Sequence, residues 1–383
     1  MTYKIAVLPG DGIGKEVVPE AVKVLRIAIE SCNGPDVEFV EMEAGGEFYL
    51  RTGREWTEDT EAFVKTEADA ILLGAVGARN SSGNSVRLPD GNLAGYSVVI
   101  GLRFALDLYA NVRPVRLLEG VPTPLADKTP RDIDMVVVRE NTEGLYAPIR
   151  GTLVRSGEPE VALDVRVITE KGSRRVVERA FEIAKRRNGR PSDGQSMVTC
   201  VDKSNLLAGC QLFRRVFNEV AEKYPTIRPD YAYVDAWTQW CVRRPESFDV
   251  VVAPNSFGDI ITDLGAAIQG GLGVAPAANI GDGKGVFEPV HGSAPDYYGK
   301  NVANPIAAIL SGAMMMDWLG ETRNDGRCSQ TAKVIELAVE RVLREGKVRT
   351  YDLCKGRWSG VTPSSTTAVG DAVAQAATEI AAG

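Results

Sequence analysis

The stretch I-A-V-L-P-G-D-G-I-G, residues 5–14, joins a short aliphatic run to a glycine-rich turn, and a helical pattern follows from 15 to 31. The same alternation recurs along the chain. Short β-branched or aliphatic runs occur at 37–41, 70–73, 135–138, 197–200, 231–234 and 250–253, and further helical patterns at 58–66 and 171–187. Apolar runs that alternate with helices are typical of α/β units around a buried, largely parallel sheet. The sequence therefore predicts an α/β fold.

The glycine-rich turn from Gly10 to Gly14 allows two interpretations. It follows a strand and opens a helix, as a dinucleotide-binding turn does, but the G-x-G-x-x-G spacing of that motif is broken. The alternative is a tight turn that requires glycine and lines a pocket. The broken spacing favours this alternative.

Composition limits the class of protein. A chain of 383 residues, 44% of them apolar, is long enough for a large core and more than one lobe. A net charge of -7 disfavours binding to nucleic acid or to a membrane surface, because both need a basic footprint. The six cysteines lack a C-x-x-C pair, which indicates reduced thiols. With no targeting or transmembrane pattern, we expect a cytoplasmic protein.

The single histidine, His291, lies in the glycine-containing loop V-H-G-S-A-P-D. Acid–base chemistry must therefore rest on lysine, tyrosine and carboxylates. Lys203 lies in V-D-K-S-N just past a predicted strand and is a candidate base, because neighbouring charge can poise a lysine. Tyr146 closes R-E-N-T-E-G-L-Y and is a candidate acid.

Three aspartates are candidate metal ligands. Asp259 and Asp263 in N-S-F-G-D-I-I-T-D are four residues apart, which stacks their carboxylates on one face of a predicted helix. Asp235 in Y-V-D-A-W follows another strand. Hard cations such as Mg2+ or Mn2+ prefer oxygen ligands of this kind. Helix N-caps and solvated surface acids are the alternative.

Three arginines, Arg103, Arg113 and Arg139, lie beside predicted strand ends or turns. Arginine forks bind carboxylates in a bidentate manner, so three convergent arginines suit a di- or tricarboxylate. Taken singly, each is also explained as a surface ion pair.

Together these segments resemble the β-decarboxylating dehydrogenases, the family of the isopropylmalate, isocitrate, homoisocitrate, tartrate and D-malate enzymes. The motifs N-x-F-G-D-I-x-x-D, V-D-K-x-N, Y-V-D-A, A-N-V-R-P and H-G-S-A-P-D occur here in the family's order. The resemblance runs from the glycine-rich turn to Asn304, and more weakly beyond it.

The resemblance implies a two-lobed isopropylmalate/isocitrate dehydrogenase-like fold and not a G-x-G-x-x-G Rossmann domain. The cofactor-side lobe would combine 1–108 with 270–383, and 109–269 would form the substrate and dimerisation lobe. Alternating residues predict a hairpin near 150–167, which would join two subunits of a homodimer with shared active sites.

The resemblance also assigns roles in an oxidative decarboxylation of a malate. Arg103, Arg113 and Arg139 would hold the substrate carboxylates, and Asp235, Asp259 and Asp263 would hold Mg2+ or Mn2+. Lys203 would help to remove the proton of the C2 hydroxyl, and Tyr146 would protonate the enolate carbon. Asp235 and Lys203 would come from the partner subunit.

For the dinucleotide, the resemblance implies contacts with Ile13, Asn205, Glu288, His291, Gly292, Ser293, Ala294, Asp296 and Asn304. A carboxylate at Asp296 accepts hydrogen bonds from ribose hydroxyls and repels a 2′-phosphate, which favours NAD over NADP. Tyr297 is the conflicting cue, because NADP-using isocitrate enzymes also carry a tyrosine there.

The C3 substituent of the malate stays open between several substrates. Val99 and Ile100 replace two leucines of isopropylmalate enzymes, which suits an apolar group, whereas Ser97 aligns with a serine that isocitrate enzymes direct toward a carboxylate. The motifs R-E-N-T-E-G-L-Y and A-N-V-R-P are closer to the isocitrate, homoisocitrate and tartrate enzymes, and a D-malate dehydrogenase is a further alternative. The long loop at 78–95 carries Arg87, which is either a solvated arginine or a contact for a further anionic group, as in a 3-phosphonomethylmalate. A non-catalytic regulatory subunit of the same fold is the alternative from another class.

Overall fold

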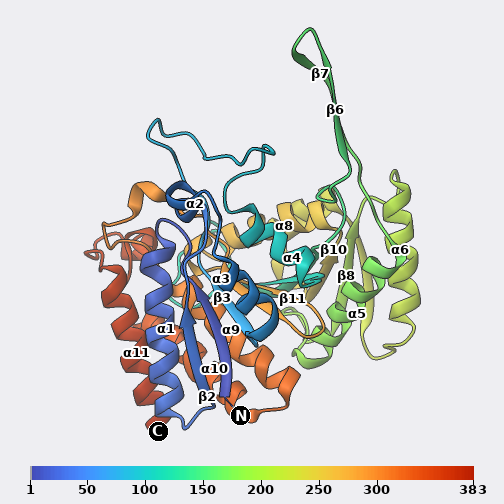
Figure 1. Cartoon of the computed structure of the whole chain (residues 1–383). Helices are drawn as coiled ribbons and strands as arrows, with labels where there is room; N and C mark the ends of the chain where they lie inside the picture. The colour runs from blue at the N-terminus through green and yellow to red at the C-terminus, as the bar shows by residue number, and fades with distance from the viewer. Residues whose placement is uncertain (1) are drawn as a thin grey trace. The chain divides into compact units, whose positions relative to one another are not determined.

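The computed structural model describes residues 2–383 and divides into two compact units (Figure 1). Unit 1 comprises the chain up to Leu108 together with Leu117–Asp127 and Ala266–Gly383, and unit 2 comprises Tyr109–Arg116 and Lys128–Gly265. Residues 117–127 and 266–269 fall in unit 1, although the family resemblance placed them in the other lobe. For 117–127, the physical reason is a buried contact: Arg349 Nη1 donates a hydrogen bond to the Gly120 carbonyl at 3.1 Å.

The sheet of unit 1 has the strand order β2-β1-β3-β12-β11. Its strands are β1 (Thr2–Leu8), β2 (Asp36–Glu41), β3 (Ala70–Leu73), β11 (Pro276–Ile280) and β12 (Gly285–Pro289). β1 pairs in parallel with β2 and β3, β12 pairs in parallel with β3, and only the pairing of β11 with β12 is antiparallel. The predicted runs at 5–8, 37–41 and 70–73 are therefore strands of one largely parallel sheet.

Long helices pack on this sheet and on one another. They are α1 (Gly14–Ser31), α9 (Ile306–Arg323), α10 (Gly326–Glu345) and α11 (Thr366–Ala382). Figure 1 shows α1 lying beside α11, and α1 buries Val17, Val18, Ala21 and Val24 on one side, as an amphipathic helix does. α9 is apolar almost all round because it lies between the sheet and the other helices.

The sheet of unit 2 has the strand order β4-β5-β10-β8-β9. Its strands are β4 (Ala110–Arg116), β5 (Asp134–Glu140), β8 (Met197–Asp202), β9 (Arg228–Tyr233) and β10 (Val250–Ala253). β5, β10, β8 and β9 run parallel, and β4 is antiparallel to β5. The helices of this part of the chain are α5 (Glu170–Arg186), α6 (Ala208–Ala221), α7 (Val234–Arg243) and α8 (Asn255–Ile268). Parallel strands bring their carboxyl ends to one edge, and residues that follow β5, β8, β9 and β10 are candidate site residues.

The helix expected at 58–66 is divided. An α-helical turn, α3 (Glu58–Ala62), continues as the π-helical η1 (Phe63–Glu67), in which Ala68 N–H donates to the Phe63 carbonyl five residues earlier. The remaining short elements are α2 (Gly46–Thr52), η2 (Ser97–Gly101), α4 (Leu102–Ala105), η3 (Pro245–Ser247), η4 (Leu272–Val274), η5 (Pro295–Tyr297), η6 (Tyr351–Leu353) and η7 (Gly356–Trp358).

The predicted hairpin consists of β6 (Arg150–Arg155) and β7 (Glu158–Asp164), which pair in antiparallel fashion. Ser156 and Gly157 both have positive φ, as a two-residue hairpin turn requires. Every residue of both strands is exposed, and Figure 1 shows the hairpin extending away from the sheet of unit 2.

All six cysteines are free thiols, as the sequence predicts. No helix within residues 2–383 combines the length and the apolar character needed to cross a membrane.

Candidate active-site residues

The acidic helix α8 begins directly after β10, and Asp259 and Asp263 lie one turn apart on it. Two arginines from neighbouring strands contact this pair. Arg139, near the end of β5, donates from Nη1 to Asp259 Oδ1 at 2.5 Å, and Arg113, on β4, donates from Nη1 to Asp263 Oδ1 at 3.1 Å. Arg113 Nη2 also lies 3.7 Å from Asp259 Oδ1. The structure thus brings together four of the predicted site residues.

Arg139 is fixed by a residue that the sequence analysis missed. Its Nε and Nη2 donate to Asn255 Oδ1 at 3.2 and 2.8 Å, and Asn255 Nδ2 in turn donates to the Glu143 carbonyl at 2.9 Å. The arginine side chain is only 2% exposed, so its direction is set by packing as well as by charge. Asn255 opens the N-S-F-G-D motif just after a predicted strand, and that place is the signal by which it could have been found.

Gly258 lies directly behind Arg139. A Cβ at this helical position would meet Arg139 Cγ at 2.5 Å and Cβ at 2.7 Å. We expect Gly258→Ala to displace the arginine, to cost about 1–3 kcal/mol of unfolding free energy and to raise the KM for a malate substrate. Thermal unfolding and steady-state kinetics check this. Gly326→Ala is the matched control, because nothing lies within 4 Å of a Cβ there, and equal effects of both variants would contradict the prediction.

Arg113 has a similar buried environment. Its Nε donates to Asn111 Oδ1 at 2.9 Å and its Nη1 to Thr262 Oγ1 at 2.9 Å. The side chain is about one-tenth exposed, so the two guanidinium groups present their charge to one small region of unit 2. A buried cation requires such partners, because an unpaired one is very costly.

Tyr146 joins the same group. Its hydroxyl donates to Asp259 Oδ2 at 2.7 Å, and its ring lies against the Arg139 guanidinium at 5.5 Å. The side chain is exposed, so the hydroxyl is accessible to a ligand. Tyrosine, arginine and aspartate together place a proton donor beside a carboxylate-binding group.

Lys203 and Asp235 form a separate pair. Lys203 follows β8, Asp235 lies in the first turn of α7 after β9, and Lys203 Nζ is 2.8 Å from Asp235 Oδ1. The hydrogen bond from Lys203 lowers the pKa of the Asp235 carboxyl. Asn205 is exposed in the turn that follows Lys203. Lys203 and Asp235 were predicted from their places after strands, whereas Asn205 was expected only from the family resemblance.

The predicted metal ligands are not all together in one chain. Within residues 2–383, no three histidine, cysteine, aspartate or glutamate side chains are grouped closely enough to hold a metal ion. Asp259 and Asp263 supply two adjacent carboxylates on α8, an oxygen donor set that fits Mg2+ or Mn2+, and the nearby arginines and tyrosine occupy the same oxygens. In the part of the chain that the structure describes, no third acid joins these two.

In unit 1 the glycine-rich turn packs against the histidine loop. Ile13 N–H donates to the Ser293 carbonyl at 2.8 Å, and a Cβ at Gly12 would lie 2.1 Å from the same oxygen. Gly12 also has a positive φ of 53°, so glycine is required twice over. This supports the interpretation of a pocket-lining turn that places Ile13 beside the loop.

Asp11, in the same turn, holds three segments together and was missed by the sequence analysis. Its carboxylate accepts hydrogen bonds from the N–H groups of Gly46, Glu47 and Gly77 at 2.7–2.8 Å. Burial raises the pKa of this carboxyl. The partners lie 35 to 66 residues away in sequence, so no local pattern indicates them.

The loop residues show features that fit a dinucleotide. The half-buried His291 leaves Nε2 without a hydrogen-bond partner among the described residues, and burial lowers the pKa of its imidazole. A Cβ at Gly292 would meet nothing within 4 Å, so open space lies beside the loop backbone. Ala294 has a positive φ of 37°, a costly conformation for a residue other than glycine. An unpartnered ring nitrogen and an open, strained loop are consistent with a polar ligand.

Glu288, Arg103 and Asn304 lie on other elements of unit 1. Glu288, on β12, accepts from Asn279 Nδ2 at 2.7 Å and lies 3.5 Å from Arg103 Nη2. The Arg103 side chain is 10% exposed, and its Nε has no partner in the described part of the chain. Asn304 donates to Asp352 at 3.0 Å and accepts from Ile306 N–H at the start of α9. Arg103 therefore retains a buried donor for an anion.

Ser97 is engaged within the protein. Its hydroxyl donates to Glu55 Oε2, and the same carboxylate accepts from the N–H groups of Gly95 and Ser97. Burial raises the pKa of the Glu55 carboxyl. Val99 and Ile100 are half-buried on η2 beyond this contact. Glu55 thus fixes the segment that carries the candidate specificity residues, and it lies too far away in sequence for the pattern to reveal it.

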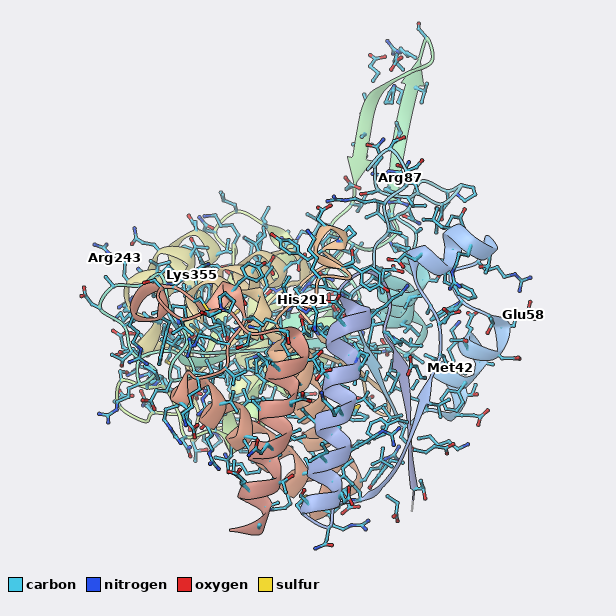
Figure 2. All side chains as sticks on the ribbon, turned by 90° about the vertical axis from the view of Figure 1, so that its left-hand side faces the viewer. Met42, Glu58, Arg87, Arg243, His291 and Lys355 are labelled. Atoms are coloured by element: carbon cyan, nitrogen blue, oxygen red, sulfur yellow. The ribbon has the colours of Figure 1, made fainter. Side chains whose placement is uncertain are left out.

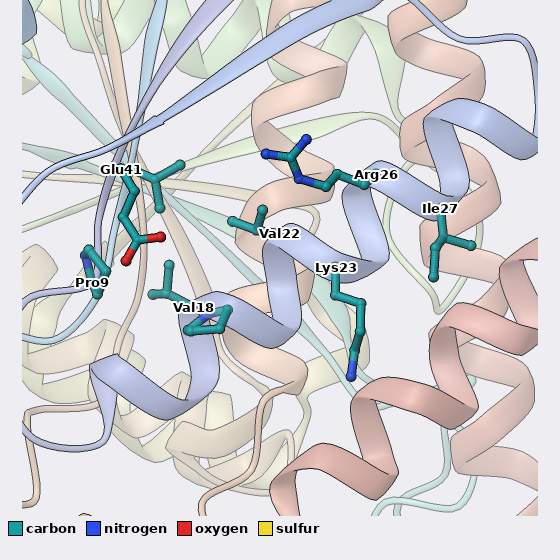
Figure 3. Close-up of a pocket in the computed structure, with 9 residues that line it drawn as sticks. Pro9, Val18, Val22, Lys23, Arg26, Ile27 and Glu41 are labelled. Carbon is teal, nitrogen blue, oxygen red and sulfur yellow. The ribbon is translucent and has the colours of Figure 1, made fainter.

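Unit 1 contains a pocket beside Ser97 and Glu55 and another that is remote from the predicted site residues. One, of about 540 Å³, is lined by Glu55, Ser97 and Leu88 of the 78–95 loop among others. The second, of about 410 Å³, lies between α1 and the β1–β2 edge and contains none of the predicted site residues (Figure 3). There Lys23 points toward α11, where it pairs with Asp371 at 2.5 Å. The second pocket therefore offers no support for the predicted site.

Comparison with known proteins agrees with the geometry. A parallel α/β sheet with acids, arginines and a lysine at its strand ends fits an enzyme that binds an anionic substrate, and the family model described as isocitrate/isopropylmalate dehydrogenase matches residues 4–373. The chain belongs to this family and is a decarboxylating dehydrogenase.

Individual relatives span nearly the whole chain. A 3-isopropylmalate/3-methylmalate dehydrogenase of Methanocaldococcus jannaschii is 43% identical over 354 residues, covering 92% of this chain and 94% of the relative. A decarboxylating D-malate dehydrogenase of Escherichia coli is 44% identical over 354 residues, covering 90% and 92%. The crystal structure of isocitrate dehydrogenase from Methylococcus capsulatus has a TM-score of 0.81 at 35% identity, covering 98% of this chain and 99% of that one.

Proposed function

We propose that the protein catalyses the NAD-dependent, Mg2+- or Mn2+-dependent oxidative decarboxylation of a D-malate-type 2-hydroxy acid to a 2-keto acid, CO2 and NADH. The observation that carries this proposal is the group formed by Arg113, Arg139, Tyr146, Asp259 and Asp263. It combines two buried guanidinium groups for carboxylates, two carboxylates for a cation and one proton donor.

The residues of the chain supply binding and proton transfer. Arg113 and Arg139 would hold the malate carboxylates, assisted by Arg103. Lys203, as the neutral amine, would accept the C2 hydroxyl proton, and the Asp235 carboxylate would stabilise the ammonium that forms; Tyr146 would deliver a proton to C3 after CO2 has left. Asp235, Asp259 and Asp263 would hold the cation, which would supply positive charge to the C2 oxygen when bound, and the dinucleotide would supply the acceptor for the C2 hydride.

For the substrate, we favour a malate with an apolar C3 substituent, such as a 3-isopropylmalate. Val99 and Ile100 offer apolar surface, and the Ser97 hydroxyl is already used by Glu55, which leaves it less able to bind a carboxylate. D-malate, tartrate, isocitrate and homoisocitrate are the alternatives. Arg87, the cue for a phosphonate, donates to the Gly91 carbonyl of its own turn at 2.6 Å, and Figure 2 shows it well away from His291.

We further propose a homodimer with shared active sites. Asp235 and Lys203 pair apart from the acids of α8, so a complete metal and proton-transfer site would need this pair from the partner subunit. The exposed hairpin, with Leu153, Val161 and Leu163 on its surface, is the candidate dimer contact. The free thiols suit a cytoplasmic location.

The proposal is tested by NADH formation with Mn2+ and a panel of D-malate, tartrate, isopropylmalate, isocitrate, homoisocitrate and a phosphonate-bearing malate, repeated with NADP. We expect one dominant substrate, turned over with NAD. Preference for NADP would disprove the cofactor assignment. No turnover with any member would disprove the substrate class and favour a non-catalytic regulatory subunit.

A further inference from the structure

The 78–95 loop sends one arginine to the end of the histidine loop. Arg79 Nη1 donates to Asp296 Oδ2 at 3.0 Å, across 217 residues of sequence. The two side chains are 49% and 74% exposed, so this ion pair contributes little to stability. Its position is informative, because Asp296 is the residue expected to meet the adenosine ribose of the cofactor.

The backbone around Arg79 is well defined. Arg79 forms an antiparallel bridge with Ser85, and Asn80 N–H donates to the Asn84 carbonyl at 2.8 Å to close the turn between them. On the other side, Gly77 N–H is held by the buried Asp11 carboxylate at 2.8 Å. The guanidinium therefore extends from a fixed turn and not from a free segment.

The pairing has a consequence for nucleotide recognition. A guanidinium fork is a good ligand for a phosphate, and the Asp296 carboxylate beside it both repels a 2′-phosphate and engages one nitrogen of the fork. We propose that Arg79 is a second cofactor-specificity residue: Asp296 occupies its guanidinium, and release of this guanidinium creates a binding site for the 2′-phosphate of NADP. The inference rests on the proposed dinucleotide site. If repulsion by Asp296 alone set the cofactor preference, Arg79 would have no part in it.

Other cations near the loop are engaged differently. Lys300 lies over the Tyr297 ring at 5.7 Å, and Lys15 pairs with Glu47 at 2.5 Å. Arg87 belongs to the same loop as Arg79 but bonds its own turn. Removal of the Asp296 charge would therefore release Arg79 and none of these other cations. Arg87 is the matched control, because it belongs to the same loop but does not contact Asp296.

The test uses binding of adenosine fragments, so that it does not depend on turnover. Dissociation constants of 5′-AMP and 2′,5′-ADP are measured by calorimetry for the wild type, Arg79→Ala, Asp296→Asn and the double variant. We expect the wild type to prefer 5′-AMP, Asp296→Asn to gain at least about tenfold in affinity for 2′,5′-ADP, and the double variant to lose that gain. Arg87→Ala in the Asp296→Asn background should keep it.

Each contrary outcome has a distinct meaning. A gain that persists in the double variant would show that charge repulsion alone sets the preference, and would overturn the inference, as would no gain in Asp296→Asn. If neither fragment binds any of the proteins, the inference fails, while NADH formation in the substrate panel would still support the proposed function. A wild type that already prefers 2′,5′-ADP would overturn both the inference and the NAD assignment. Unchanged thermal unfolding of these exposed-site variants checks that they fold.

Discussion

Replacement of Lys203 by methionine is expected to reduce turnover by about 10³-fold while binding of Mn2+ and substrate remains measurable. Methionine keeps most of the length of the side chain but removes the amino group, whose Nζ lies 2.8 Å from Asp235 Oδ1. Without the amine, the proposed acceptor of the C2 hydroxyl proton is lost. Rapid-mixing measurement of NADH formation, together with calorimetric titration of Mn2+ and substrate, separates the chemical step from binding.

The matched control for this variant is Lys223→Met. Lys223 also forms an ion pair across unit 2, with Glu178 at 3.1 Å, but it lies on no strand end that carries a candidate site residue. Its replacement should leave turnover within about twofold, because exposed ion pairs contribute little. If Lys203→Met retained full turnover, the lysine would have no part in proton transfer.

The parts of the site that the sequence predicts are those with a local signal. The four-residue spacing of Asp259 and Asp263 requires only that the segment be helical, and α8 makes it so. Arg139 and Lys203 were found because each follows or ends an aliphatic run, and parallel strands place such ends along one edge. The antiparallel β4 carries Arg113 to the same acids, a pairing that the periodicity of β4 alone does not indicate.

The residues that the sequence did not reveal act through long-range contacts. Glu55 reaches Ser97 across 42 residues, and Arg79 reaches Asp296 across 217. A single charged residue in a loop belongs to no repeating pattern of apolar residues. Its partner depends on which segments the fold brings together, and the local sequence does not show this. Asp11 was visible as part of the glycine-rich turn, but its three backbone partners become neighbours only after β1, α2 and β3 have assembled.

Asp259→Asn should have the second large effect, a loss of about 10²–10³-fold in turnover with a parallel loss of Mn2+ affinity. The carboxylate contacts Arg139 at 2.5 Å and the Tyr146 hydroxyl at 2.7 Å, so an amide weakens the cation site and leaves a buried guanidinium without its counter-charge. Mn2+ titration and steady-state kinetics check both effects. Asp371→Asn, on α11, removes an exposed carboxylate paired with Lys23 and should change neither. Unaltered Mn2+ affinity in Asp259→Asn would exclude this aspartate as a ligand.

The two inactive variants together test whether the active site is shared between subunits. Lys203 and Asp259 would serve one site from opposite subunits, so a mixed dimer of Lys203→Met with Asp259→Asn would contain one site with both native residues and one site with neither. Random exchange of equal amounts makes about half of the dimers mixed, and activity should recover to about a quarter of the wild type. Denaturation and refolding of the mixture, against each variant refolded alone, measures this recovery. A mixture as inactive as its components would place Lys203 and Asp259 in a site formed by one chain, because each mixed dimer would then carry a defect in both sites.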